Sequence, residues 1–275
     1  MNVLHEKRFA IIGAGNIGTI LLKQLQAAGI PPEHLTVCDS DPVKAQAAET
    51  RFGVQVGTLS DPCIYGADVL LLSASPMAIT GIVQAVAGCL KPGQVIISFA
   101  AAVPISHLEA LVPPEVSLIR IMPNAPSLVG KGMNPVVYGS AASLEAQATA
   151  KAILELLGDS IELHDDQMNW AVGLSGATMR SLLPVLEGMT RAGIDAGLPE
   201  NEARRVAAQV MAGTAAMALD TDLSFEQIKA LTPMQTVDEA AIAQLFLDAA
   251  YAAKGKLDSL QSRLFGETHP VSSEV

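Results

Sequence analysis

Short, mainly apolar runs alternate with helically spaced apolar residues over about the first 160 positions. Such continuous runs are typical of parallel strands that are buried on both faces. Glycine, proline or aspartate follows most of the runs. The alternation therefore predicts an α/β fold with a doubly wound, mainly parallel sheet. The strands are expected at residues 9–12, 35–38, 54–56, 69–74, 95–99, 117–122 and 136–138.

The pattern changes after Leu163, because no strand is expected from Asp165 onward. Only helical periodicity remains there, which predicts an all-helical second domain. An alanine-rich face from Ala203 to Ala216 is suited to close helix contacts, within one subunit or between two. We predict domains at 1–163 and 164–265 and a loose polar tail at 266–275. The helices of the second domain are expected at residues 167–196, 199–220, 224–230 and 237–264.

Composition excludes several classes of protein. Half of the 275 residues are hydrophobic and 16% are charged, which is far from a disordered composition. The net charge of −11 disfavours nucleic-acid and anionic-membrane surfaces. No signal peptide and no apolar run of about 20 residues is present, so we expect a soluble, cytoplasmic protein. Three separated cysteines are expected to be buried thiols, and five scattered histidines predict no metal site.

The first strand leads directly into a Gly-x-Gly-x-x-Gly pattern at Gly13, Gly15 and Gly18, with helical spacing after it. In a strand–turn–helix context, the first glycine permits the bend, the second admits a pyrophosphate, and the third lets the helix pack on the strand. The free N–H groups of the helix start then face the phosphates. The alternative is a glycine turn in an ordinary βα unit that binds no ligand.

Asp39 supports the ligand-binding interpretation. It ends the second strand, 21 positions after Gly18, where dinucleotide-binding folds place an acid for the ribose hydroxyls. A carboxylate there would repel a 2′-phosphate, so we predict NAD(P)H as cofactor with a slight preference for NAD. Lys44 is a nearby cation. It either attracts the 2′-phosphate of NADP or is only a residue of the protein surface.

Several motifs in order along the chain resemble the pyrroline-5-carboxylate reductase family. The most specific is the Arg-x-Met-Pro-Asn segment that ends at Asn124. The motifs lie at residues 11–18, 120–126, 129–132, 174–176, 187, 192–193 and 197–198. The resemblance implies a Rossmann-like domain, a helical dimerisation domain exchanged between subunits of a homodimer or larger ring, and NAD(P)H-dependent reduction of a cyclic imine to proline.

The resemblance also implies site residues. The cofactor would be held by the glycine turn, and the strand-end segment 73–76 and Asn124 would line the nicotinamide side. Without the resemblance, Asn124 after Pro123 could equally be a plain turn residue. The implied residues are Gly13, Gly15, Asn16, Ile17, Gly18, Ser73, Ala74, Ser75, Pro76 and Asn124.

Both substrate blocks depart from the family pattern. The family's Gly-Ser-Gly-Pro-Ala-Tyr is Gly-Ala-Thr-Met-Arg-Ser at 176–181, and its Ser-Pro-Gly-Gly-Thr-Thr is Thr-Pro-Met-Gln-Thr-Val at 232–237. Val237 cannot form the hydrogen bond of the family's second threonine. Ser75 replaces a usual lysine, and Ala102 replaces a usual glycine. A different small imine, or loss of catalysis, is physically reasonable.

Reduction of a C=N bond needs a hydride on carbon and a proton on nitrogen, and a hydroxyl that orients the nitrogen is sufficient. Thr236, Thr232 and Ser175 are the candidate catalytic residues, and a helix cap or a backbone bond is the alternative for each. The candidate substrate residues are Gly176, Thr178, Arg180 and Gln235.

Arg180 could hold a substrate carboxylate, with a surface salt bridge as its alternative. For the whole protein, a non-catalytic nicotinamide-binding protein of the same fold is the rival interpretation. A hydroxyacid dehydrogenase would require a lysine between Asp166 and Leu198, and none is present there.

Overall fold

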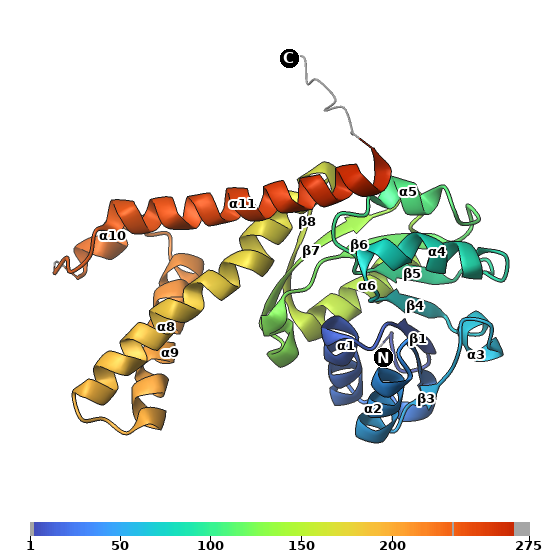
Figure 1. Ribbon diagram of the computed structural model, residues 1–275, viewed down its shortest axis with the longest axis horizontal. Helices are drawn as coiled ribbons and strands as arrows, with labels where there is room; N and C mark the ends of the chain where they lie inside the picture. The colour runs from blue at the N-terminus through green and yellow to red at the C-terminus, as the bar shows by residue number, and fades with distance from the viewer. Residues whose placement is uncertain (1–2, 233, 267–275) are drawn as a thin grey trace, which may run out of the picture. The chain divides into compact units, whose positions relative to one another are not determined.

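In the computed structural model, which describes residues 3–232 and 234–266, the described residues form an eight-stranded sheet with the order β3-β2-β1-β4-β5-β6-β7-β8 (Figure 1). All neighbouring strands are parallel except β6 and β7, which are antiparallel. The strands are β1 (Phe9–Ile12), β2 (Leu35–Cys38), β3 (Gln55–Val56), β4 (Val69–Leu72), β5 (Val95–Ser98), β6 (Ser117–Ile121), β7 (Gly132–Tyr138) and β8 (Gly158–Glu162). The predicted mainly parallel α/β sheet is confirmed.

Helices connect the strands and cover both faces of the sheet, as the right-handed crossovers of parallel strands require. They are α1 (Asn16–Ala27), α2 (Pro42–Phe52), α3 (Pro62–Tyr65), α4 (Pro76–Ala87), α5 (Ile105–Glu109) and α6 (Leu144–Leu157). Proline stands at the first helical position of α2, α3 and α4, where its missing N–H costs no hydrogen bond. Short 3₁₀ helices lie at Pro32–His34, Ala125–Val129 and Asp165–Gln167.

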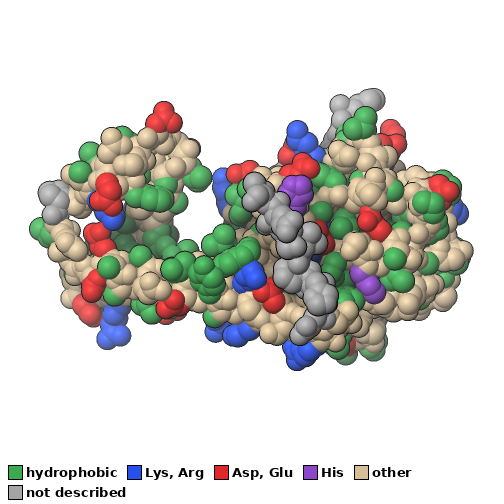
Figure 2. Space-filling model, turned by 90° about the horizontal axis from the view of Figure 1, so that it is seen from above, with side chains coloured by type: hydrophobic (Ala, Val, Ile, Leu, Met, Phe, Trp, Pro, Cys, Tyr) green, Lys and Arg blue, Asp and Glu red, His purple; other side chains and the backbone are tan. Residues whose placement is uncertain are grey.

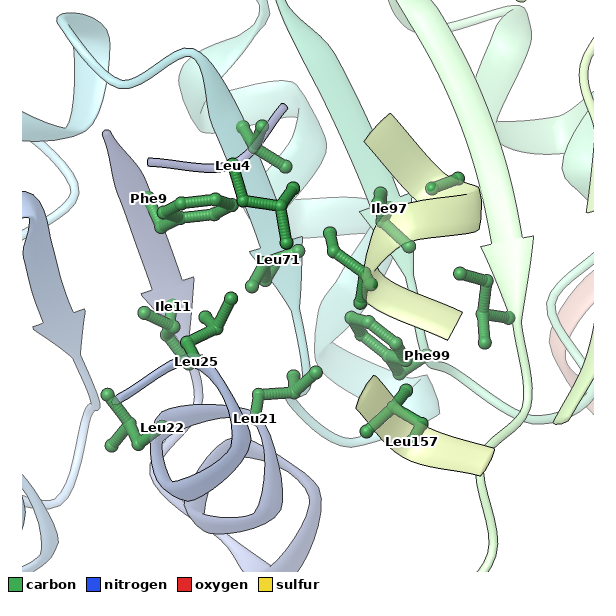
Figure 3. Close-up of a cluster of buried hydrophobic side chains, with 14 of the residues drawn as sticks. Leu4, Phe9, Ile11, Leu21, Leu22, Leu25, Leu71, Ile97, Phe99 and Leu157 are labelled. Atoms are coloured by element: carbon green, nitrogen blue, oxygen red, sulfur yellow. The ribbon is translucent and has the colours of Figure 1, made fainter. Parts of the chain in front are cut away.

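Two hydrophobic clusters lie on the two faces of the sheet. In the first, leucines of α1 lie beside Phe9 and Ile11 of β1 and Leu71 of β4 (Figure 3). All four residues of β1 are buried, because helices cover both of its faces. This burial fixes the direction of β1 and therefore the place where the glycine turn begins.

The long helix predicted at 167–196 is interrupted. Helix α7 (Met168–Val172) is followed by a π-helical turn at Gly173–Ala177, which we call the π-turn, and then by α8 (Thr178–Asp195). One extra residue in the turn replaces i→i+4 by i→i+5 bonding, which a periodicity pattern does not reveal. The remaining helices are α9 (Glu200–Asp220), α10 (Phe225–Ala230) and α11 (Glu239–Phe265). The absence of strands after Asp165 is confirmed for the described residues.

The described residues form two compact units. The first comprises the residues up to Gly176 together with those from Ala253 onward, and the second comprises 177–252. The domain boundary predicted between 163 and 164 stays a prediction, and the predicted loose tail lies, apart from Gly266, outside the described residues.

The second unit, which we call the helical unit, buries little of its own surface. Gly193 of α8 faces Ala203 of α9 so closely that an added Cβ would lie 2.8 Å from the alanine Cβ. Yet only Ala203, Ala207 and Ala250 are buried among its described residues. Hydrophobic side chains such as Leu219, Phe225 and Leu245 are exposed, and such side chains are visible on the surface of this unit in Figure 2. An apolar helix surface of this extent indicates a protein interface.

The cysteine prediction was wrong for one residue. Cys38 is buried at the end of β2, whereas Cys89 is exposed, because it lies in the turn after α4. Neither of these two thiols is in a disulfide. Within the described ranges, no helix is long and apolar enough to cross a membrane, and no cluster of three metal-ligating side chains occurs.

Candidate functional site

A cavity of about 650 Å³ lies at the carboxyl ends of β1, β2 and β4. Strand β1 is flanked by β2 on one side and by β4 on the other, so the chain reverses its direction of progress across the sheet here. Such a switch point is where open α/β sheets bind their ligands. The cavity is lined by Ile12, Gly13, Gly15, Cys38, Asp39, Ser40, Lys44, Gly57, Thr58, Leu59, Ser73, Ala74, Ser75, Ala78 and Ile82.

The three turn glycines meet three different constraints. Gly13 has φ 109°, and an added Cβ would lie 2.7 Å from the backbone of Ser73 and Ala74. Gly15 lines the cavity, and an added Cβ would meet nothing within 4 Å. Gly18 is packed so that its Cβ would lie 2.0 Å from the Gly13 carbonyl oxygen. The turn therefore has the bend, the open approach and the close packing of a pyrophosphate-binding loop.

Ser73 fastens the end of β4 to this turn. Its hydroxyl donates to the Gly13 carbonyl oxygen at 2.7 Å, and its backbone N–H donates to the Ile12 carbonyl oxygen at 2.8 Å. The single proton of the hydroxyl is thus used within the protein, and Ser73 also lines the cavity. Ser73 shapes the turn, which sequence reasoning did not foresee.

The Asp39 carboxylate is held at the cavity by two backbone amides. Its Oδ2 accepts from the Ala14 N–H at 2.7 Å, and its Oδ1 accepts from the Asp41 N–H at 2.8 Å. Each oxygen retains a lone pair for a ligand hydroxyl. Lys44 also lines the cavity, 3.9 Å from Asp41 Oδ2. The site therefore combines one fixed acid with one cation that already has a neighbouring acid.

The structure brings together most of the predicted cofactor residues, but not all of them. Asn16 is exposed at the start of α1, Ile17 packs against the core, and Pro76 begins α4. Gly18 lies behind the turn rather than in the cavity wall. Sequence reasoning missed the residues 57–59 and Ala78 and Ile82 of α4. The available signal was that residues 57–59 follow a strand of the same parallel sheet.

Asn124 ends the segment after β6 and uses both of its amide groups within the protein. Its Nδ2 donates to the Ser175 carbonyl oxygen at 3.0 Å, and its Oδ1 accepts from the Met133 N–H at 3.2 Å. Ser175, a candidate catalytic residue, donates its hydroxyl to the Ala171 carbonyl oxygen at 2.8 Å. This is the local alternative that the sequence left open for a helical serine. Gly176, a candidate substrate residue, lies next to it in the π-turn.

A chain of hydrogen bonds between buried polar groups lies in the segment that follows Asn124. The Ser127 hydroxyl donates to Asn134 Oδ1 at 2.8 Å, and Asn134 Nδ2 donates to the Asp159 carbonyl oxygen at 2.8 Å. Ser127 and Asn134 are both fully buried. Gly132 is enclosed by this chain, because an added Cβ would lie 2.0 Å from Ser127 Oγ and 2.9 Å from Asn124 Oδ1. Satisfied buried networks of this kind make a segment rigid.

Gly132→Ala is expected to lower the free energy of unfolding by about 1–3 kcal/mol, because the methyl group overfills this space and displaces the Ser127 hydroxyl from Asn134. Chemical denaturation monitored by far-UV circular dichroism measures the change. Gly53→Ala is not a matched control, since Gly53 has φ 67°, whereas Gly81→Ala is, because nothing lies within 4 Å of its Cβ. Equal stability of Gly132→Ala and Gly81→Ala would contradict the expectation.

Arg120 and Asp165 form a buried ion pair that sequence reasoning missed. Arg120 Nη1 lies 2.6 Å from Asp165 Oδ1, and the arginine side chain is 1% exposed. Asp165 Oδ2 also accepts from the Ile105 N–H at 2.9 Å. Burial lowers the pKa of Arg120 below its ordinary value, and the charge of Asp165 opposes that shift. The sequence alone gave no sign of this partner, because Asp165 lies 45 residues from Arg120 in the chain.

The other predicted site residues belong to the helical unit. Thr178 and Arg180 lie in the first turn of α8, and Arg180 is exposed. Thr232, Gln235 and Thr236 lie in the exposed connection between α10 and α11. In this connection Gln235 Nε2 donates to the Val237 carbonyl oxygen at 3.4 Å. The roles of these five residues stay predictions.

Ala102 lies where the family pattern has glycine. Its φ of 59° is left-handed, a conformation that glycine adopts without strain and alanine does not. Its side chain is fully buried, so the surrounding packing holds it there. The residue that departs from the family pattern therefore stands at a backbone position that glycine would fit without strain.

The fold and the cavity define a dinucleotide-binding oxidoreductase with a helical dimerisation domain. Residues 8–102 match the family described as NADP oxidoreductase coenzyme F420-dependent, and residues 165–254 match pyrroline-5-carboxylate reductase dimerisation. Over 243 residues the chain is 32% identical to pyrroline-5-carboxylate reductase of Pseudomonas aeruginosa, covering 87% of this chain and 88% of that one. The chain belongs to the pyrroline-5-carboxylate reductase family.

Further relatives agree. The pyrroline-5-carboxylate reductase of Corynebacterium melassecola is 28% identical over 263 residues, covering 91% of this chain and 97% of the relative. The Coxiella burnetii enzyme structure has a TM-score of 0.75 at 24% identity, with 92% and 98% covered. The Plasmodium falciparum pyrroline carboxylate reductase with NADP bound has a TM-score of 0.81 at 18% identity, with 94% and 99% covered. The two structures show the fold.

Proposed function

We propose that this protein reduces pyrroline-5-carboxylate, or a closely related small cyclic imine, with NAD(P)H to give proline or the corresponding amine. The observation that carries the proposal is the open Gly15 position at the switch-point cavity of a chain that belongs to this family. Gly15 and the start of α1 provide backbone N–H groups and a helix N-terminus toward a pyrophosphate. Asp39 would accept from ribose hydroxyls.

The protein's own part in the reaction is to bind the substrate and cofactor and to orient the imine. Bound NAD(P)H supplies the hydride that goes to the imine carbon, and a proton goes to the imine nitrogen. A protonated iminium already carries that proton, so a hydroxyl that orients the nitrogen is sufficient. Thr236 is the proposed orienting residue, with Thr232 and Ser175 as further candidates. Val237 has no hydroxyl, so the second hydrogen bond of the family's loop is lost.

NAD is the proposed preferred cofactor. Asp39 is fixed by two backbone amides, so it cannot turn away from a 2′-phosphate without losing both bonds. A carboxylate held in this way repels the phosphate of NADP. Lys44 opposes this effect only in part, because it already lies beside Asp41.

The proposed assembly is a homodimer, or a larger ring built from dimers. The helical unit matches the family's dimerisation domain and exposes large apolar side chains, so self-association covers surface that a single copy leaves in water. Size-exclusion chromatography with light scattering would give the number of copies. A purely monomeric protein at micromolar concentration would contradict this part of the proposal.

The activity is tested by following nicotinamide oxidation with NADH and NADPH separately, against pyrroline-5-carboxylate and a panel of cyclic imines. Turnover of the pyrroline with a higher kcat/KM for NADH is the expected result. Turnover of another imine alone would assign the altered blocks at 176–181 and 232–237 to substrate choice. Tight cofactor binding without any turnover would favour the non-catalytic interpretation.

Arg180→Ala is expected to raise the KM for an imine carboxylate by about 10- to 100-fold, the equivalent of one lost charge-assisted hydrogen bond. The reason is that Arg180 stands in the block where the family has small residues, and its exposed guanidinium offers two parallel donors to a carboxylate. Arg205→Ala is the matched control, since Arg205 is also exposed and pairs with Glu202 on α9. An unchanged KM in Arg180→Ala would remove this residue from the substrate site.

A further inference from the structure

Asn124 links two segments of the chain through its side-chain amide. One Nδ2 proton is donated to the Ser175 carbonyl oxygen and Oδ1 accepts from the Met133 N–H, and the amide has a second Nδ2 proton and a second Oδ1 lone pair besides. The orientation of the amide is determined by chemistry, because the Ser175 carbonyl requires a donor and the Met133 N–H requires an acceptor. The two bonds thus join the end of β6, the start of β7 and the π-turn.

The π-turn is a segment that needs such a bond. A π-helical turn is rare and occurs mostly as a single turn inserted into an α-helix, frequently at functional sites. If the inserted residue relaxes into regular α-helix, the residues on one side rotate by about 100° about the helix axis. Ser175 and Gly176 lie within this turn, so their direction depends on whether the wide turn persists.

The Asn124 side is rigid enough to hold the turn. The buried Ser127–Asn134–Asp159 chain fixes the segment between β6 and β7, and Gly132 allows it to pack without a gap. The 3₁₀ helix Ala125–Val129 that begins after Asn124 is closed by the Gly130 N–H, which donates to the Ser127 carbonyl oxygen at 3.1 Å. Asn124 therefore connects this rigid segment to the π-turn.

We infer that Asn124 is a positioning residue: its hydrogen bond to the Ser175 carbonyl oxygen holds the π-turn in place and thereby orients Ser175 and Gly176 for the substrate. The kinetic part of this inference rests on the proposed imine reduction, whereas the structural part does not.

Trp170 provides a direct readout of the π-turn. It is the single tryptophan of the chain and lies on α7, one turn before Ser175. Its ring lies 5.3 Å from Lys254 Nζ of α11. It also lines an apolar cavity of about 570 Å³ together with Met133, Leu174 and Ser175. A change in the π-turn alters the surroundings of this ring, so the emission spectrum reports on the turn in the absence of any cofactor.

Asn124→Asp is the sharpest variant, because aspartate keeps the shape and the acceptor for Met133 but has no donor for Ser175. The expected result in the cofactor-free protein is a shifted Trp170 emission maximum and faster hydrogen exchange at residues 173–177. The NADH Kd is expected to stay within about twofold, and kcat/KM for the imine to fall by about 10- to 100-fold. Asn124→Ala, which also loses the Met133 contact, serves as the second variant if the aspartate variant does not fold.

Asn16→Ala is the matched control, because Asn16 is an exposed asparagine at the glycine turn and a candidate cofactor residue. It is expected to weaken NADH binding and to leave the Trp170 emission unchanged. The inference is overturned if Asn124→Asp shows wild-type emission and exchange while its NADH Kd rises tenfold. If the wild-type protein reduces no imine, the proposed function fails, and the emission and exchange of Asn124→Asp still decide whether Asn124 holds the π-turn.

Discussion

Asp165→Asn is expected to lower the free energy of unfolding by about 3–5 kcal/mol, because it leaves the Arg120 guanidinium buried without a counter-charge. The asparagine cannot replace both bonds of the carboxylate. Asp165 accepts from Arg120 with one oxygen and from the Ile105 N–H with the other, whereas an amide has one acceptor and a donor that would face a donor. Denaturant unfolding at pH 7, followed by far-UV circular dichroism, measures the loss.

Two comparisons separate this effect from a general loss of charge. Glu145→Gln removes a carboxylate from the Lys7–Glu145 pair, whose acid is 81% exposed, and is expected to change stability by less than about 1 kcal/mol. The paired replacement Arg120→Met with Asp165→Leu is expected to recover much of the loss, because it removes the buried charge altogether. An Asp165→Asn protein as stable as Glu145→Gln would show that Arg120 does not depend on its partner.

Gly15→Ala is expected to weaken the binding of NADH and NADPH by about 10- to 100-fold while the protein folds normally. The backbone of Gly15 has φ −73°, which alanine adopts without strain, and an added Cβ meets no protein atom within 4 Å. The methyl group would instead occupy the cavity, where the backbone must approach a pyrophosphate closely. The expected loss corresponds to one charge-assisted hydrogen bond to a phosphate.

Cofactor titration, followed by nicotinamide fluorescence, measures this loss, and the unfolding curve shows that the fold is intact. Gly81→Ala in α4 is the matched control, since its Cβ also meets nothing and it does not line the cavity. Unchanged cofactor affinity in Gly15→Ala would place the pyrophosphate away from the glycine turn. A large loss of stability in this variant would instead show that Gly15 has a structural role.

The geometry of the glycine turn was predictable because its determinants are local in sequence. Gly13, Gly15 and Gly18 lie in one turn, and their spacing alone indicates the bend, the open approach and the close packing that the structure shows. Asp39 was predictable for a similar reason, because it ends the next strand of a parallel sheet, and parallel neighbours bring their carboxyl ends to one edge. The mostly apolar runs determined the strands, since burial on both faces leaves few polar positions within them.

Only the tertiary structure decided which distant polar groups meet. Arg120 and Asp165 are 45 residues apart, and Asn124 and Ser175 are 51 apart, so nothing local in the chain specifies either pair. The π-turn was hidden because one inserted residue does not disturb a helical pattern of apolar positions enough to be seen. The sequence by itself thus determined the family, the sheet and the glycine turn through short-range pattern. The fold decided the partners of Asp165 and Asn124, because a buried polar group must find its partner among residues that packing brings to it.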